Sequence, residues 1–178
     1  RFHATHLVCN LVTLSTAYQS AINEVAESWA CVTELSEEEL APVSFNVSRA
    51  PEFMPLGTDY RHAKEHVTRD TINQILVCYG GSDPQNITGK TLNWLRHSIA
   101  SGDLPHATSI VAVMGSLFDR HEEVNQAANQ LPLKVSLRTA IQPSELAEAA
   151  RQSDIAITTS GGTMYEFSAL GLPCIVVP

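Results

Sequence analysis

Several absences limit the class of protein that this sequence encodes. Its longest apolar runs, such as Cys174–Val177, fall far short of the ~20 residues that a membrane-spanning helix needs. The N-terminus does not combine a basic segment, an apolar stretch and a small-residue cleavage site, so no secretory signal is visible. The cysteines form no Cys-x-x-Cys pair, and two of them lie in apolar, strand-like runs. We therefore expect reduced core thiols in a cytoplasmic protein.

Basic charge is also scarce, since 11 Lys and Arg stand against 19 Asp and Glu for a formal net charge of -8. A nucleic-acid or anionic-membrane binder would carry a basic stripe, so neither partner is expected. A small anionic ligand is not excluded, because backbone N–H groups hold phosphate without Lys or Arg. The 178 residues fit one large domain or a domain with an appendage. The chain begins without Met and stops just after an apolar run, so we expect it to be part of a longer protein.

From residue 75 onward, short apolar runs alternate with helical patterns. The runs indicate buried parallel strands, and the first two are closed by glycines. Alternation with short connections predicts an α/β fold: a doubly wound parallel sheet with right-handed crossovers and helices on both faces. The expected strands are Ile75–Tyr79, Ser109–Met114, Leu133–Leu137, Asp154–Thr159 and Cys174–Val177.

Four helices are predicted between these strands. One carries Leu92, Leu95 and Ile99 on one face and ends near Gly102. The next is expected to begin with a capping box, because Asp119 precedes Glu122 by three residues. Pro143 suits the first position of the third helix. The last is a short helix that contains Tyr165, Glu166 and Leu170.

Residues 1–70 have a less regular pattern. We interpret His6–Leu14 as a strand, Thr16–Trp29 as a helix and the acidic Glu34–Leu40 as a helical stretch. We expect a domain boundary between Pro55 and Thr71, because the pattern becomes regular only after it. We therefore divide the chain into residues 1–70, a partial or remodelled N-terminal segment, and residues 71–178, a Rossmann-like domain truncated at its C-terminus.

Two glycine loops mark the expected ligand site. Ligands of doubly wound sheets bind beyond the carboxyl ends of the strands, where the strand order reverses. With the order 3-2-1-4-5, the loops after the first and fourth strands face each other across that crevice. Glycines let the backbone approach a ligand closely, and each loop leads into a helix N-terminus that favours phosphate. The loops are Gly80-Gly81-Ser82-Asp83-Pro84 and Ser160-Gly161-Gly162-Thr163.

Other interpretations of these loops stay open. A single Gly-Gly after a strand is more often only a tight turn. Glu166 could accept hydrogen bonds from two ribose hydroxyls. It could equally cap its own helix, because Thr163 precedes it by three residues in a capping-box spacing. Neither loop is a Walker A or a G-x-G-x-x-G sequence, which disfavours ATP hydrolysis and NAD chemistry.

The same loops carry a family resemblance. Ile75–Thr88 (I-L-V-C-Y-G-G-S-D-P-Q-N-I-T) and Asp154–Pro178 resemble segments of the UDP-sugar hydrolases of pseudaminic acid biosynthesis. Those enzymes remove UDP from a 2,4-diacetamido-2,4,6-trideoxy sugar nucleotide. The second segment is more distantly similar to the C-terminal half of the lipid-II-forming N-acetylglucosaminyltransferases. Leu56–Tyr60 also resembles the hydrolases' L-G-x-x-Y segment.

The resemblance implies the C-terminal half of a glycosyltransferase-B fold that binds UDP or a UDP-sugar. It places the diphosphate against the two glycine loops, the ribose on Glu166, and the uracil near Met114–Leu117. It implies no cofactor and no metal. The implied UDP-binding residues are Gly80, Gly81, Ser82, Gly115, Ser160, Gly161, Gly162, Thr163 and Glu166.

One family feature is missing, and no catalytic residue can be assigned. The hydrolases open with a G-x-G-H-x-x-R loop whose His is the implied general base, and no such string occurs here. His3 and His6 lack the glycines, and His62 and His66 fit a solvated helix face better than a metal site. The leading hypothesis is a UDP-sugar hydrolase present mainly as its nucleotide-binding domain. The alternatives are a glycosyltransferase of the same fold and a non-catalytic nucleotide-sugar-binding module. The sequence leaves the sugar and the oligomeric state open.

Overall fold

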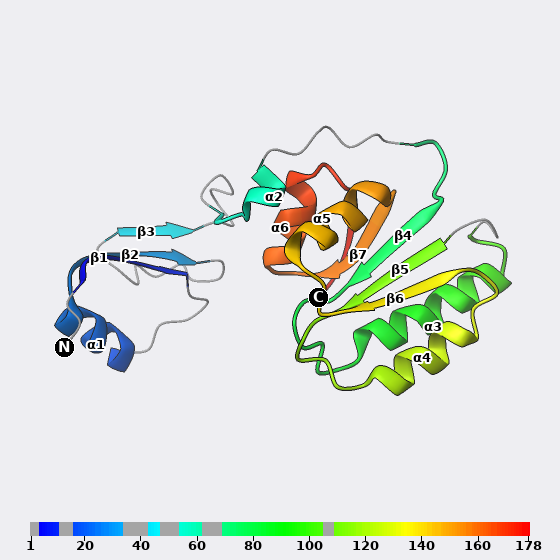
Figure 1. Cartoon of the computed structure of the whole chain (residues 1–178), viewed down its shortest axis with the longest axis horizontal. Coiled ribbons are helices and arrows are strands. Elements are labelled where there is room, and N and C mark those ends of the chain that lie inside the picture. Colours follow the sequence, from blue (N-terminus) through cyan, green and yellow to red (C-terminus); the bar gives the residue numbers. More distant parts are fainter. Residues whose placement is uncertain (1–3, 11–15, 34–42, 47–53, 62–68, 105–108) are drawn as a thin grey trace. The chain divides into compact units, whose positions relative to one another are not determined.

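The chain divides into two compact units, residues Arg1–Pro55 and Leu56–Pro178. The computed structural model describes residues 4–10, 16–33, 43–46, 54–61, 69–104 and 109–178 (Figure 1). Residues 56–61 thus belong to the second unit, whereas the sequence division placed them in the N-terminal segment. That the second unit is a nucleotide-sugar-binding domain stays a prediction.

The first unit contains a three-stranded parallel sheet in the order β1-β2-β3. The predicted helix through Trp29 is wrong beyond Val25, because Trp29 belongs to a strand and pairs in register with Leu7. Strand pairing with β1 here overrides a helical spacing of apolar residues. The expected helical stretch Glu34–Leu40 lies outside the described residues. The elements are β1 (Ala4–Asn10), α1 (Thr16–Val25), β2 (Ala26–Thr33) and β3 (Val43–Asn46).

The second unit is the predicted doubly wound α/β domain. Its five parallel strands lie in the order β6-β5-β4-β7-β8, so the first and fourth strands of the domain, β4 and β7, are neighbours at the reversal of strand order. This is the predicted order 3-2-1-4-5. The strands are β4 (Gln74–Cys78), β5 (Ser109–Met114), β6 (Val135–Thr139), β7 (Ile155–Thr159) and β8 (Cys174–Val177).

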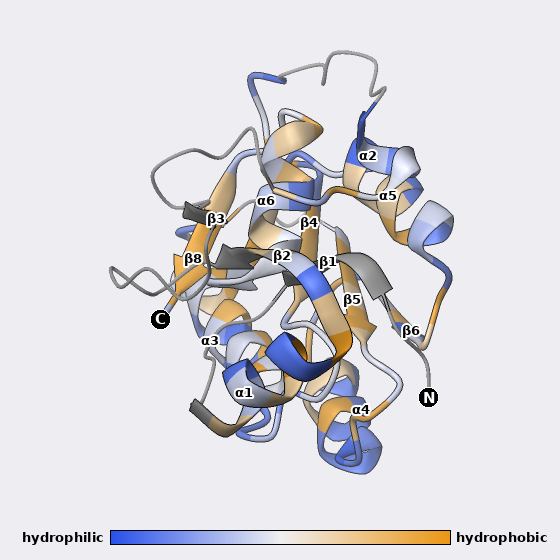
Figure 2. Ribbon diagram, turned by 90° about the vertical axis from the view of Figure 1, so that its left-hand side faces the viewer, coloured by the Kyte–Doolittle hydropathy of each residue, from blue (hydrophilic) through white to orange (hydrophobic). Residues whose placement is uncertain are grey.

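Helices cover both faces of this sheet, with α3 and α4 on one side and α5 and α6 on the other (Figure 1). Apolar residues of the strands pack under each pair of helices and form two core clusters. Figure 2 shows β4, β5 and β8 of this sheet largely in orange, whereas α4 has both blue and orange segments along its length. The helices are α2 (Thr58–Arg61), α3 (Ile87–Ala100), α4 (His121–Asn129), α5 (Pro143–Gln152) and α6 (Gly162–Ala169).

The start of α5 is as predicted from the sequence, whereas the start of α4 is not. Pro143 occupies the first turn of α5, as predicted, and the Glu145 carboxylate accepts a hydrogen bond from the Gln142 N–H at 2.8 Å. The capping box expected at Asp119 is wrong, because Arg120 is the N-cap of α4 and no side chain caps that helix. The start of α4 is held instead by an edge-on contact of the His121 and Phe118 rings, whose centroids lie 5.2 Å apart.

One buried carboxylate, that of Asp154, joins the amino-terminal ends of β4 and β7. Asp154 accepts hydrogen bonds from the Asn73 and Gln74 N–H groups at 2.7 and 2.9 Å and pairs with Arg69. Burial alone would raise the pKa of Asp154, but Arg69 and the two N–H groups together hold it below its usual value. This network joins the start of β4 to β7 at the edge opposite the carboxyl ends. In the part of the chain that is described, no helix has the length and apolarity needed to cross a membrane.

Candidate functional site

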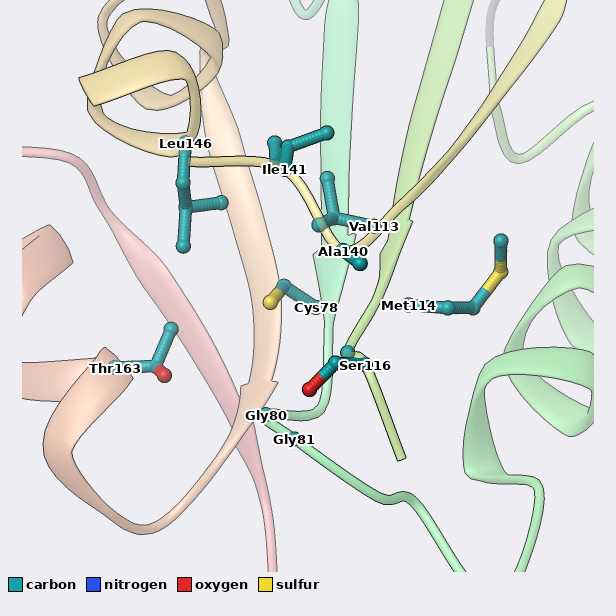
Figure 3. Close-up of a pocket in the computed structure, with 11 residues that line it drawn as sticks. Cys78, Gly80, Gly81, Val113, Met114, Ser116, Ala140, Ile141, Leu146 and Thr163 are labelled. Carbon is teal, nitrogen blue, oxygen red and sulfur yellow. The ribbon is translucent and has the colours of Figure 1, made fainter. Parts of the chain in front are cut away.

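A pocket of about 360 Å³ lies at the carboxyl ends of β4, β5 and β6. Figure 3 shows Thr163 and Leu146 on one side of it and Ser116 on the other, with the sulfur of Cys78 between them. The pocket therefore lies where ligands of doubly wound sheets bind. Its lining consists of Cys78, Gly80, Gly81, Val113, Met114, Gly115, Ser116, Ala140, Ile141, Leu146 and Thr163.

The loops after β4 and β5 touch through their backbones at Gly115. A Cβ atom at this position would lie 2.3 Å from the Cα and carbonyl oxygen of Gly81, and 2.5 Å from the carbonyl oxygen of Gly80. The Leu117 N–H also donates to the Gly81 carbonyl at 3.0 Å. Gly80 has a φ of 77°, which glycine adopts at little cost. Glycine at 115 is thus required by the contact that shapes this wall.

The N-terminus of α3 is already occupied by the chain's own side chains. The buried Asp83 carboxylate accepts hydrogen bonds from the Ile87 and Thr88 N–H groups at 2.7 and 2.8 Å. Asn86, the N-cap, accepts one from the Gly89 N–H at 3.0 Å. The glycine loops predicted phosphate binding at the starts of both α3 and α6, and the capping role of Asp83 and Asn86 was not predicted. Asp and Asn just before a helix are the signal that could have revealed it.

The N-terminus of α6, in contrast, has no side-chain cap. Its N-cap is Gly161, at φ 156°, and Thr163 in the first turn lines the pocket. Unsatisfied N–H groups at a helix start, together with the helix dipole, favour an anion. Among the described helices that begin at the pocket edge of the sheet, α6 therefore offers amide groups that α3 does not.

Glu166 does not cap its helix. The capping box with Thr163 requires Thr163 at the N-cap, but α6 begins one residue earlier and Thr163 lies inside it. The described residues donate no side-chain or backbone hydrogen bond to the Glu166 carboxylate. Burial raises its pKa. The carboxylate also lies close enough to Tyr60 and Cys78 to raise the pKa of both groups further after their burial.

Cys78 is the one ionisable side chain among those that line the pocket. Burial raises the pKa of its thiol to about 11, and the nearby Glu166 and Asp83 carboxylates act in the same direction. The thiol is therefore neutral at physiological pH and is a poor nucleophile. No general base for hydrolysis is present among the residues that line this pocket.

The pocket brings together part of the predicted site. Gly80, Gly81, Gly115 and Thr163 line it, and Met114 and Ser116 belong to the segment implied for uracil. The remaining predicted residues flank this lining without being part of it: Ser82, Ser160, Gly161, Gly162 and Glu166. The roles of these five residues in UDP binding stay predictions.

One wall of the pocket was not predicted from the sequence: the apolar wall formed by Ala140, Ile141 and Leu146. These residues follow β6, a strand that ends at the same edge of the sheet, and that position was the available signal. His3, His62 and His66 lie outside the described residues, as does the side chain of His6. Within the described ranges, no group of three or more His, Cys, Asp or Glu side chains is placed to hold a metal ion.

Comparison with known proteins gives two distant relatives, and no family model matches the chain. The chain is 28% identical over 131 residues to the uncharacterized protein MJ1062 of Methanocaldococcus jannaschii, which covers 71% of this chain and 26% of that protein. It is 28% identical over 134 residues to the spore coat polysaccharide biosynthesis protein SpsG of Bacillus subtilis, covering 74% of this chain and 37% of the relative. The chain thus spans well under half the length of the curated relatives it matches.

Proposed function

We propose that the second unit binds UDP or a UDP-sugar in the pocket at the carboxyl ends of its strands. The observation that carries this proposal is the uncapped start of α6 beside the glycine loops, next to a helix α3 that is capped by Asp83. The diphosphate lies against the Gly162 and Thr163 N–H groups, and no Lys or Arg is needed there. The name of the Bacillus relative, a polysaccharide biosynthesis protein, supports a sugar-linked ligand.

The nucleoside fits the remaining walls. Ile141 and Leu146 provide an apolar surface for the uracil ring, and the backbone around Gly115 and Ser116 provides polar groups at its edge. The Glu166 carboxylate receives the two ribose hydroxyls, which supply the donors that it lacks among the described residues. A mostly apolar pocket with a few polar groups is the usual composition of such a site.

The parent reaction is hydrolysis of a diacetamido-trideoxy UDP-sugar, in which water displaces UDP and the free sugar is released. In this reaction, negative charge develops on the departing diphosphate. The oriented N–H groups at the start of α6 stabilise that charge and require no reorganisation. The residue that activates water must come from outside the described pocket lining, because Cys78 is neutral and the other lining residues do not ionise.

A second candidate, a nucleotide-sugar-binding module without chemistry of its own, is favoured by that same lack of an ionisable group. Calorimetry with UDP, UMP and uridine tests the shared premise, and UDP release from UDP-sugars with and without acceptors separates the candidates. Hydrolysis predicts acceptor-independent release, and a binding module predicts affinity without turnover. Release that requires an acceptor would point to a glycosyltransferase. Absence of UDP affinity would contradict all three.

A further inference from the structure

Helix α2 lies against both helices that form one side of the pocket. It packs on α5 and α6, and its Tyr60 side chain is only 2% exposed. The ring belongs to the core cluster that also contains Ala147 of α5 and Phe167 of α6. Tyr60 therefore packs into the core that α5 and α6 share.

Two hydrogen bonds fix α2 to α5. The Tyr60 hydroxyl donates to the Pro143 carbonyl at 3.3 Å, in the first turn of the helix. The Arg151 guanidinium donates to the Asp59 carbonyl at 2.6 Å, in its last turn. The short segment α2 is thus joined to both ends of α5.

Both helices carry residues of the pocket. Leu146 of α5 and Thr163 of α6 line it from the same side, as Figure 3 shows. Tyr60 is not among the residues that line the pocket, but it packs against the helices that carry these two side chains. It also lies within electrostatic reach of Glu166.

We propose that Tyr60 is a positioning residue that sets the separation of α5 and α6, and so the width of the pocket for a uridine nucleotide. The inference rests on the proposed function. Removal of the ring leaves a cavity beneath both helices, which then relax toward each other. The start of α6 and the apolar wall then move relative to the glycine loops. Displacements of this kind misplace the groups that contact the ligand and so weaken its binding.

The test compares Tyr60→Leu and Tyr60→Phe in the full chain with matched changes at Tyr79. Tyr79 is also buried, at 6% exposed, but it packs in the other core cluster and its hydroxyl bonds to Thr91 at 2.7 Å. Calorimetry separates the two effects of each variant. A smaller folded fraction lowers the apparent number of UDP sites per chain, whereas a changed pocket raises the dissociation constant for UDP.

We expect Tyr60→Leu to raise the dissociation constant for UDP about tenfold. Tyr60→Phe keeps the ring but loses the hydrogen bond to the Pro143 carbonyl, so it should raise the dissociation constant about threefold, on the scale of one weak hydrogen bond. Tyr79→Leu and Tyr79→Phe should lower thermal stability and leave the dissociation constant unchanged. Unchanged affinity in folded Tyr60→Leu would overturn the positioning role while leaving the proposed function intact. If Tyr60→Leu does not fold, an affinity for Tyr60→Phe equal to that of the Tyr79→Phe control overturns it instead. No UDP binding by the wild-type chain would overturn the proposed function itself.

Discussion

At the scale of single residues, Gly115 and Gly81 lie against each other, but only position 115 lacks space for a side chain. A side chain at 115 would point into the backbone of the neighbouring loop, at 2.3 Å from Gly81. A side chain at 81 would meet nothing within 4 Å, and its φ is not in the left-handed region. One glycine is therefore needed for the fold, and the other is free to serve a ligand.

We predict that Gly115→Ala destabilises the protein by about 3 kcal/mol, at the upper end of the usual cost of overpacking, because backbone atoms cannot move aside as a side chain would. Chemical denaturation measures this loss. Gly81→Ala is the control, and its free energy of unfolding should stay close to the wild-type value. If the pocket binds UDP as proposed, Gly81→Ala instead weakens UDP affinity. Equal stability of the two variants would contradict the close contact of the loops.

Glu166 is a residue whose burial works against folding. Its pKa is raised because the ionised carboxylate is partly removed from water. The carboxyl group therefore costs nothing below its ordinary pKa of about 4.5 and becomes unfavourable as the pH rises through the raised value. A half-buried carboxylate without a described donor is the arrangement expected of a group kept for a ligand.

We predict that Glu166→Gln is more stable than the wild type near pH 7, with a difference that vanishes near about pH 4, where both side chains are neutral. Unfolding titrations at a series of pH values measure this trend. UDP affinity should fall by roughly tenfold or more, because hydrogen bonds to a charged group are lost. A variant that is less stable at neutral pH and binds UDP normally would contradict both the burial effect and the ribose role.

At the scale of elements, the two helices that flank the switch point differ in how their first N–H groups are satisfied. Asp83 and Asn86 bond three successive N–H groups of α3, whereas α6 has no side-chain cap. The Asp83 carboxylate thus satisfies N–H groups at the start of α3, whereas no side chain caps the start of α6. This asymmetry between α3 and α6 supports the proposed anion site at the start of α6.

We predict that Asp83→Ala lowers the free energy of unfolding by about 2 kcal/mol, since it removes two capping hydrogen bonds. Denaturation and amide hydrogen exchange in the first turn of α3 measure the effect. UDP affinity should change little, because α3 does not hold the diphosphate. A loss of UDP binding larger than the loss of folded protein would show that the first loop, and not α6 alone, holds the anion.

The elements that could be predicted are those whose pattern depends on local sequence. Short apolar runs predicted the strands of the second unit, and β5 and β8 have the predicted bounds. Trp29 was misassigned because its partner, Leu7, is distant in sequence and strand pairing depends on it. The pocket's apolar wall at Ile141 and Leu146 was missed for a similar reason, since its residues gain their role only when β6 takes its place in the sheet.

At the scale of the whole molecule, the net charge of -8 is compatible with the proposed ligand, because the proposed anion site consists of backbone N–H groups. An acid excess repels polyanions over long distances, but a single diphosphate interacts mainly with the N–H groups that it touches. The charge of the chain and the charge of the site are therefore separate properties.

The division of the chain gives the last prediction. The compact unit begins at Leu56, while the sequence pattern becomes regular only near residue 71. The difference matters because residues 56–70 contain Tyr60, which is 2% exposed, and Arg69, the ion-pair partner of Asp154. We predict that a chain of residues 56–178 unfolds cooperatively and binds UDP as the full chain does. The free energy of unfolding of a chain of residues 71–178 should be lower than that of the 56–178 chain by about 3 kcal/mol or more, which is the scale of removing a buried aromatic side chain. Tyr60→Leu in the 56–178 chain is the control. Its free energy of unfolding should fall by less than that of the 71–178 chain, because the variant keeps Arg69 and its ion pair with Asp154. Equal stability of the 56–178 and 71–178 chains would mean that the domain begins where its sequence becomes periodic, and that α2 is only attached to it.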